Sequence, residues 1–381
     1  MLIQTLQQLQ LTPPDQAHAQ RTAAHGLSLG ARVELPHSAP QALQLLEAQR
    51  DSAVMLSESP GMAMREHLYS LADIRSAPPL IDLGALPLDI AMHPSIVEQL
   101  VGELDKMGHT LLLVGAERNP APYMLQGLKT RRNSLSMCAI SHGMGLEPPD
   151  LGGDLSEIVE NVDDKLLHDF CLMGHQVYYT SAHTLQAIRN KHFDLIRLGQ
   201  IRADHRDAEP TFRGSDAVSI DLRAVRASDC PCHFQPNGLH AEEICQLARY
   251  AGGADRVAAI ALHGLPSDAS AQVHSLAAQI VWHLIEGISL RRHEHPTTTP
   301  SRFKRFIVST SPGTDLIFYR SNQANTWWME LHPAIQEKTT LIPCSPADYT
   351  QACQQAPPER WLRSISRVQR NNSLPKQPNE G

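Results

Sequence analysis

The stretch that decides the fold is Asp216-Ala217-Val218-Ser219-Ile220-Asp221-Leu222-Arg223, an apolar run that ends in a carboxylate and a guanidinium. An apolar run of this length between charged residues predicts a buried strand. It is followed by Pro236-Asn237-Gly238-Leu239, which predicts a turn, and by a helical pattern that contains Glu243. A strand, a turn and a helix in this order predict one βα unit of a parallel sheet.

The same alternation extends from about residue 52 to residue 290. Short apolar runs predict strands at 53–57, 80–83, 110–115, 135–141, 176–180, 217–222 and 256–263. Amphipathic runs between them predict helices at 95–107, 120–130, 182–190, 240–251 and 269–290. Two weaker helices are expected before residue 52. The pattern therefore predicts an α/β domain with a parallel sheet over residues 1–290.

The pattern changes after residue 290. Residues 291–300 are charged and then rich in Thr and Pro, which predicts a linker. Period-two alternation then predicts antiparallel strands, with a turn at Ser311-Pro312-Gly313 and a short helix after them. The expected strands are 305–310, 315–320 and 326–331, and the expected helix is 345–355. We thus expect a small β-rich extension at 301–369 and a polar, disordered tail at 370–381.

The composition narrows the class of protein. The chain has 381 residues, 42% of them hydrophobic, which is enough for a full core. Its net charge of −7 argues against nucleic acid or an anionic membrane as a partner. No apolar run approaches the length of about 18 residues that a membrane span needs, and the first residues lack a signal-peptide pattern. Seven cysteines, an odd number, are typical of free thiols. We therefore expect a cytoplasmic protein.

One motif raises the question of a soft-metal site. Cys230-Pro231-Cys232-His233 places two thiols and an imidazole side by side. Zinc sites normally separate paired cysteines by about two to four residues and add a second pair of ligands. The one-residue spacer therefore favours ordinary loop thiols.

Three further strings are specific enough to compare with known families. They run from Pro236 to Gly252, from Ser311 to Asn322 and over Trp327-Trp328-Met329-Glu330. Together with residues 216–223 they resemble the arginase, agmatinase and formimidoylglutamase family, and most closely its formimidoylglutamase-like branch from Bacteroidetes, which carries the same C-terminal extension. The resemblance covers roughly residues 50 to 365. It implies a three-layer α/β/α sandwich around an eight-stranded, mostly parallel sheet.

The resemblance also implies a metal centre. Enzymes of that family hold two Mn²⁺ ions at the carboxyl ends of the strands, and a bridging hydroxide attacks a guanidinium or formimino carbon. Carboxylates and imidazoles from three segments bind these hard ions. The first segment carries a histidine in the family, but here it reads Ala116-Glu117-Arg118.

The other two segments depart from the ligand pattern as well. Alignment of the second on His142 places Ile140 and Met144 at its two carboxylate positions. The third keeps Asp221 but has Arg223 in place of the second carboxylate. A guanidinium cannot ligate a metal because it is always charged and has no free lone pair. Only His142 and Asp221 match, so the resemblance implies a metal centre that is mostly lost.

A fourth strand end, Ala261-Leu262-His263, lacks the acid that helps the family bind a guanidinium substrate. The resemblance implies that these strand ends converge on one cleft formed by Glu117, Arg118, His142, Asp221, Arg223, Asn237 and His263. Two arrangements of Arg223 are open in that cleft: an internal ion pair with Asp221, which we favour, or a site for a small anion.

Three functions are compatible with these residues. The first, which we favour, is a non-catalytic protein that keeps the fold for binding or assembly and needs no cofactor. The second is a hydrolase of C–N bonds in linear amidines that uses Mn²⁺ at an atypical site with His142 and Asp221. The third is a zinc site built from His142 with Cys138 or from His233 with Cys232. The expected partner is a small anionic or amidine-like molecule, and a homo-oligomer remains open.

Overall fold

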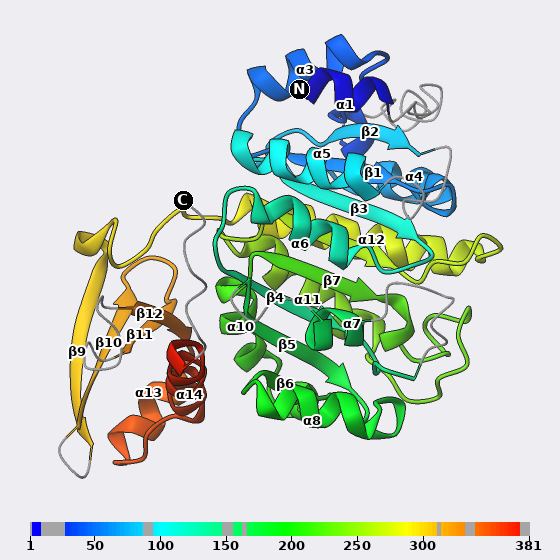
Figure 1. Cartoon of the computed structure of the whole chain (residues 1–381). Coiled ribbons are helices and arrows are strands. Elements are labelled where there is room, and N and C mark those ends of the chain that lie inside the picture. Colours follow the sequence, from blue (N-terminus) through cyan, green and yellow to red (C-terminus); the bar gives the residue numbers. More distant parts are fainter. Residues whose placement is uncertain are drawn as a thin grey trace, which may run out of the picture.

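The central sheet has eight strands in the part of the chain that the structure describes. The computed structural model describes residues 2–8, 27–86, 94–146, 155–161, 166–310, 314–331 and 340–373. The sheet order is β2-β1-β3-β8-β7-β4-β5-β6 (Figure 1). The strands are β1 Ala53–Ser57, β2 Ile81–Ala85, β3 Thr110–Ala116, β4 Leu135–Ile140, β5 Leu167–His175, β6 Asp194–Arg197, β7 Ala217–Asp221 and β8 Ala259–His263. Every pairing between them is parallel, which confirms the predicted sheet.

Two layers of helices cover the sheet because successive strand residues face opposite sides. One face, which includes Met55 and Ile220, packs on helices α4 Pro60–Ser70, α9 Leu198–Ala203, α10 Glu209–Gly214, α11 Ala241–Gly253 and α12 Ala271–Ser289. The other face, which includes Val54 and Ala139, packs on α1 Leu2–Gln8, α3 Ala39–Ala48, α5 Pro94–Met107, α6 Ala121–Lys129, α7 Leu155–Asn161 and α8 Ala182–Asn190. Burial of both faces explains why the strands are apolar along their whole length. The predicted three-layer α/β/α sandwich is confirmed.

One predicted strand is wrong, and several elements are absent from the prediction. Residues Val177–Tyr179 form a 3₁₀ turn, not part of a strand at 176–180, because the strand of this region is β5, which ends at His175. The polar residues His168 and Asp169 near the start of β5 conceal its apolar run. Elements β6, α4, α7, α9 and α10 are short or weakly amphipathic, so their sequences carry little periodic signal.

A separate antiparallel sheet forms the C-terminal extension, as predicted. Its order is β12-β11-β10-β9, with β9 Phe303–Thr310, β10 Thr314–Ser321, β11 Trp327–Leu331 and β12 Thr340–Cys344. Helix α13 Pro346–Cys353 matches the predicted short helix, whereas β12 and α14 Glu359–Ser373 were not predicted. Helix α14 enters the region predicted as a disordered tail. The rest of that region and the predicted turn at 311–313 lie outside the described residues.

Arginines attach the extension to the central domain. Arg213 of α10 donates hydrogen bonds to the carbonyl oxygens of Trp327 (2.7 Å) and Cys344 (3.1 Å). Arg363 of α14 forms an ion pair with Asp194 of β6 at 2.9 Å. Figure 1 shows the extension on the side from which the central strands start. The carboxyl ends of those strands therefore point away from it.

A buried ion pair fixes one end of the sheet to α4. Arg65 of α4 donates to both carboxylate oxygens of Asp82 in β2, at 2.7 and 2.6 Å, and Tyr69 donates to the same carboxylate. Arg65 and Asp82 are 3% and 0% exposed, so neither charge has water to replace its partner.

None of the helices in the described part of the chain combines the length and the apolar composition that a membrane crossing requires.

Candidate functional site

Polar side chains from β4, β7 and β8 meet at the carboxyl ends of these strands. Asp221 ends β7 directly beside His263, which ends β8, and His142 follows the end of β4. The chain order breaks at this point of the sheet, which is where ligands bind in open α/β folds. A cavity of about 210 Å³ lies there, and we call it the carboxyl-end cavity. Its lining includes Asn119, Ser141, His142, Met144, Tyr179, Asp221, Arg223 and His263.

Arg223 and Asp221 form a close ion pair in this cavity. The Arg223 Nε atom lies 3.0 Å from each carboxylate oxygen of Asp221, and a terminal guanidinium nitrogen lies 3.0 Å from Oδ2. The backbone N–H of Arg223 donates to Oδ1 (2.9 Å), and the Ser141 hydroxyl donates to Oδ2 (3.2 Å). Both carboxylate oxygens therefore have partners from the protein. The structure contains the internal pair that the sequence favoured, and it also contains a cavity beside it.

The two histidines contact the cavity without pairing with Asp221. The Nδ1 atom of His142 lies 4.0 Å from Asp221 Oδ2, and its ring meets Tyr179 edge-on at 5.0 Å. The Nε2 atom of His263 is hydrogen-bonded to the Ser219 hydroxyl at 2.9 Å. In turn the Ser219 hydroxyl donates to Asn119 Oδ1 at 3.1 Å. The amide nitrogen of Asn119 is buried and has no hydrogen-bond partner among the described residues.

Burial sets the protonation states. Burial, together with the charges of Arg223 and His233, lowers the pKa of His142 to about 4. Burial, together with the charge of Arg223, lowers the pKa of His263 to about 3. Burial raises the pKa of Asp221 to about 6, although the hydrogen bond from the Arg223 backbone opposes this. At neutral pH both imidazoles are therefore neutral and Asp221 is ionised beside its guanidinium.

Among the described residues, the lining of the cavity lacks the set of anionic ligands that a pair of manganese ions needs. Where the resemblance placed carboxylates, Ile140 is fully buried in β4 and Met144 lines the cavity. Asp221 uses both oxygens on Arg223, whose fixed charge would repel a divalent ion. Two ions held close together need several anionic ligands to offset their charge.

The zinc alternatives find no supporting cluster. Cys138 lies beside Cys171 in the register of β4 and β5, and the two thiols are hydrogen-bonded. Among the residues that the structure describes, no three His, Cys, Asp or Glu side chains are grouped closely enough to hold a metal ion.

The sequence placed seven residues in one cleft, and four of them line the cavity: His142, Asp221, Arg223 and His263. The other three do not line it. Glu117 and Arg118 are exposed beyond the end of β3, where the Glu117 backbone N–H donates to Glu58 at 3.4 Å. Asn237 is also exposed, and its carbonyl oxygen accepts a hydrogen bond from Gln176 at 3.0 Å.

Sequence reasoning missed Asn119, Ser141 and Tyr179. Asn119 closely follows the strand predicted at 110–115, and Ser141 is the last residue of the strand predicted at 135–141, which was an available signal. Tyr179 gave no such signal, because its segment was assigned to a strand. Its backbone also lies so close to residue 143 that the contact depends on a glycine there. A Cβ atom at Gly143 would lie 2.0 Å from the Tyr179 carbonyl oxygen, so only glycine allows this contact.

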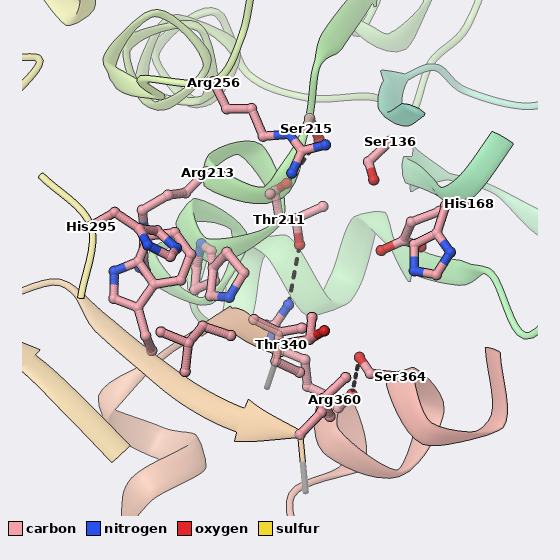
Figure 2. Close-up of a pocket in the computed structure, with 18 of the residues that line it drawn as sticks. Ser136, His168, Thr211, Arg213, Ser215, Arg256, His295, Thr340, Arg360 and Ser364 are labelled. Carbon is pink, nitrogen blue, oxygen red and sulfur yellow. Dashed lines mark hydrogen bonds between the residues drawn. The ribbon is translucent and has the colours of Figure 1, made fainter. Parts of the chain in front are cut away.

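A larger cavity of about 390 Å³ lies at the opposite, amino edge of the sheet, against the extension (Figure 2). Ser136 and His168 reach it from the starts of β4 and β5, while Thr340 and Arg360 reach it from the extension. Its arginines mainly join structural elements: Arg360, for example, is hydrogen-bonded to Thr211, Asp348 and Asp207. No sequence pattern predicted this cavity, because it exists only where the extension meets the central domain.

Comparison with solved structures places this fold among known proteins. Formiminoglutamase from Trypanosoma cruzi with bound Mn²⁺ is 17% identical over 66% of this chain and 99% of its own, with a TM-score of 0.57. Formimidoylglutamase from Bacillus subtilis is 14% identical over 63% of this chain and 88% of its own, with a TM-score of 0.55. Proclavaminate amidinohydrolase from Streptomyces clavuligerus is 14% identical over 64% of this chain and 94% of its own, with a TM-score of 0.50.

No protein-family model and no curated protein matches the sequence. At these identities the likeness to the solved structures shows a shared fold and nothing more. It leaves the function to be argued from the residues of the cavity.

Proposed function

We propose that this protein is a non-catalytic relative of the formimidoylglutamases, of the branch with a C-terminal extension, and that its carboxyl-end cavity binds a small molecule instead of a metal pair. The observation that carries this proposal is the ion pair between Arg223 and Asp221, which joins them at 3.0 Å inside the cavity. A guanidinium in this position supplies the positive charge that a metal would otherwise supply. It cannot activate water for hydrolysis, because it offers no open coordination position.

The chemistry of the cavity favours an anionic ligand. The amide nitrogen of Asn119 is a donor, it is buried, and it has no hydrogen-bond partner among the described residues. The ring nitrogen Nδ1 of His142 is also buried without a hydrogen-bond partner among the described residues, and it is a donor in the tautomer that carries its proton on Nδ1. The Arg223 side chain keeps 27% of its surface exposed after pairing with Asp221. A small carboxylate, such as a glutamate-like molecule, would satisfy the donors of Asn119 and His142 inside the cavity of about 210 Å³.

A second candidate is a metal-dependent hydrolase of C–N bonds in linear amidines. It is favoured by the fold shared with a Mn²⁺-containing formiminoglutamase and by the 4.0 Å separation of His142 and Asp221. Mn²⁺ binding at these two residues would first require Arg223 to leave Asp221. This requirement makes the hydrolase the weaker candidate.

Turnover and ligand binding separate the two candidates. With Mn²⁺ present, we expect the wild type to hydrolyse formimidoylglutamate, agmatine and arginine no faster than the Asp221→Asn variant. Turnover that this variant abolishes would support the hydrolase and contradict the proposal.

For the ligand, we expect glutamate or a similar dicarboxylate to raise the melting temperature of the wild type. Asn119→Asp replaces the buried donor by a negative charge at almost constant shape, so it should remove the ligand-induced shift. Asn190→Asp, on the exposed end of α8, adds the same charge far from the cavity and should retain the shift. Equal shifts in both variants would contradict this ligand site.

A further inference from the structure

The loop between β7 and α11 holds two thiols in contact. Cys230 and Cys232 belong to residues 226–235, whose ends are joined by a hydrogen bond from the Ala227 N–H to the Gln235 carbonyl oxygen (2.7 Å). The Cys230 N–H donates to the Arg226 carbonyl oxygen (3.0 Å), and Pro231 restricts the backbone between the two cysteines. As a result the two Sγ atoms lie 3.2 Å apart. The loop thus holds the sulfurs in contact, and they must approach from 3.2 Å to about 2.05 Å for a bond to form.

The two thiols differ in their surroundings. Cys230 is fully buried, whereas Cys232 is partly exposed and is hydrogen-bonded to the imidazole of His233. That imidazole also donates from Nε2 to the Gly264 carbonyl oxygen at 2.9 Å, which holds it in place. The hydrogen bond from Cys230 and the neighbouring His233 lower the pKa of Cys232 to about 5, while the pKa of Cys230 is raised. Cys232 is therefore the reactive thiolate, and Cys230 is the thiol behind it.

Access for a small reagent comes from the solvent side. Phe234, two residues after Cys232, is 99% exposed, so the tip of this loop faces water. A short peptide segment with a partly exposed thiolate and a second thiol in contact is the arrangement found in cysteines that undergo reversible oxidation.

We propose that Cys230 and Cys232 form a redox modification site that closes to an intraloop disulfide on reaction with a hydroperoxide. The Cys232 thiolate attacks one peroxide oxygen, the O–O bond breaks, and the leaving oxygen departs as water or an alcohol after protonation. Cys232 becomes a sulfenic acid, oxidised by two electrons as the peroxide is reduced. The sulfur of Cys230 then attacks that of Cys232: the S–S bond forms, the S–O bond breaks, and hydroxide takes the Cys230 proton to leave as water. The site is independent of the function proposed for the carboxyl-end cavity.

Mass spectrometry of the full-length protein tests the disulfide. Digestion after acidic residues releases residues 230–242, between Asp229 and Glu242, which separates both thiols from Cys245. After treatment with hydrogen peroxide, this peptide should lose about 2 Da and resist alkylation until a reductant is added. The exposed Cys353 serves as an internal control that reagents have reached the protein. An unshifted peptide 230–242 with both thiols free, in a sample where Cys353 is oxidised, would overturn the proposal.

Two variants test the order of the steps. In Cys230→Ser the sulfenic acid on Cys232 has no partner, so dimedone should trap it. In Cys232→Ser the buried Cys230 should stay a free thiol under the same treatment. In the wild type at about pH 5.5, iodoacetamide should label Cys232 about tenfold faster than Cys353, because Cys232 is largely a thiolate at this pH. Trapping on Cys230 instead of Cys232, or slower labelling of Cys232 than of Cys353, would contradict the assigned roles.

Discussion

Replacing Arg223 by methionine should leave the buried Asp221 carboxylate without its cation. Asp221 is 1% exposed, and Arg223 contacts both of its oxygens at 3.0 Å. Methionine keeps much of the side-chain length and removes the charge. Two unit charges about 4 Å apart in an environment of effective dielectric about 20 attract each other by about 4 kcal/mol. Because the Arg223 side chain is 27% exposed, water screens part of this, and we expect a loss of about 2–3 kcal/mol at about pH 7.5.

The loss of stability in Arg223→Met should depend on pH in a defined direction. Burial holds the pKa of Asp221 at about 6 in the folded protein, above its usual value, and removal of Arg223 should raise it further. A carboxyl group with a raised folded-state pKa binds its proton more tightly when folded, so its contribution to stability falls as the pH rises through this range. The deficit of Arg223→Met should therefore shrink as the pH falls toward about 5, where the folded variant becomes protonated at Asp221.

Urea unfolding of a double-mutant cycle gives the measurement. Wild type, Arg223→Met, Asp221→Asn and the double variant are compared at about pH 7.5 and about pH 5. The coupling free energy should be about 2 kcal/mol at the higher pH and clearly smaller at the lower one. A coupling below about 0.5 kcal/mol at the higher pH, or a coupling that does not change with pH, would refute this reasoning.

Three other substitutions, one of them with a control variant, test contacts at separate places in the fold. Arg65→Met leaves the buried carboxylate of Asp82 without its cation and should lower the free energy of unfolding by about 3–5 kcal/mol in urea denaturation. A loss under about 1 kcal/mol would contradict the buried pair. Gly264→Ala places a Cβ atom 2.7 Å from an oxygen of Asp221, at a backbone φ of +74°. It should lower the free energy of unfolding by about 1–3 kcal/mol. The control Gly199→Ala, whose Cβ atom would have nothing within 4 Å, should leave the stability unchanged or raise it. Arg213→Ala removes the hydrogen bonds to the extension sheet, so limited proteolysis should release the extension faster while the central domain stays intact; unchanged cleavage would show that other contacts hold it.

Parts of the site were predictable because they depend on strand periodicity alone. The apolar run before Asp221 fixes where β7 ends, and parallel pairing then places His263 beside it. The same logic failed for Glu117 and Arg118. Glu117, Arg118 and Asn119 all follow the end of β3 within three residues. The first two are exposed, and only Asn119 is buried and lines the cavity. The direction of a loop side chain is set by tertiary packing, which periodicity does not report.

Features that depend on contacts between distant segments were not predictable. The amino-edge cavity forms between the starts of β4 and β5 and the extension, whose helix α14 was missed. The contact between the sulfurs of Cys230 and Cys232 depends on the closure of a turn, while their spacing alone argued only against zinc. The resemblance implied which ligand positions were changed, whereas the pairing of Arg223 with Asp221 was one of two open arrangements that only the geometry distinguishes.

Calorimetric titration of Mn²⁺ into the purified, metal-free protein tests the central claim most directly. The account predicts no binding of a pair of ions in the micromolar range, because the described lining of the cavity supplies one carboxylate, Asp221, and that carboxylate is bonded to Arg223. The triple variant Ile140→Asp, Met144→Asp, Arg223→Asp restores the missing anionic positions and should gain measurable Mn²⁺ binding if it folds. Two Mn²⁺ ions bound to the wild type with micromolar or tighter affinity would contradict the account.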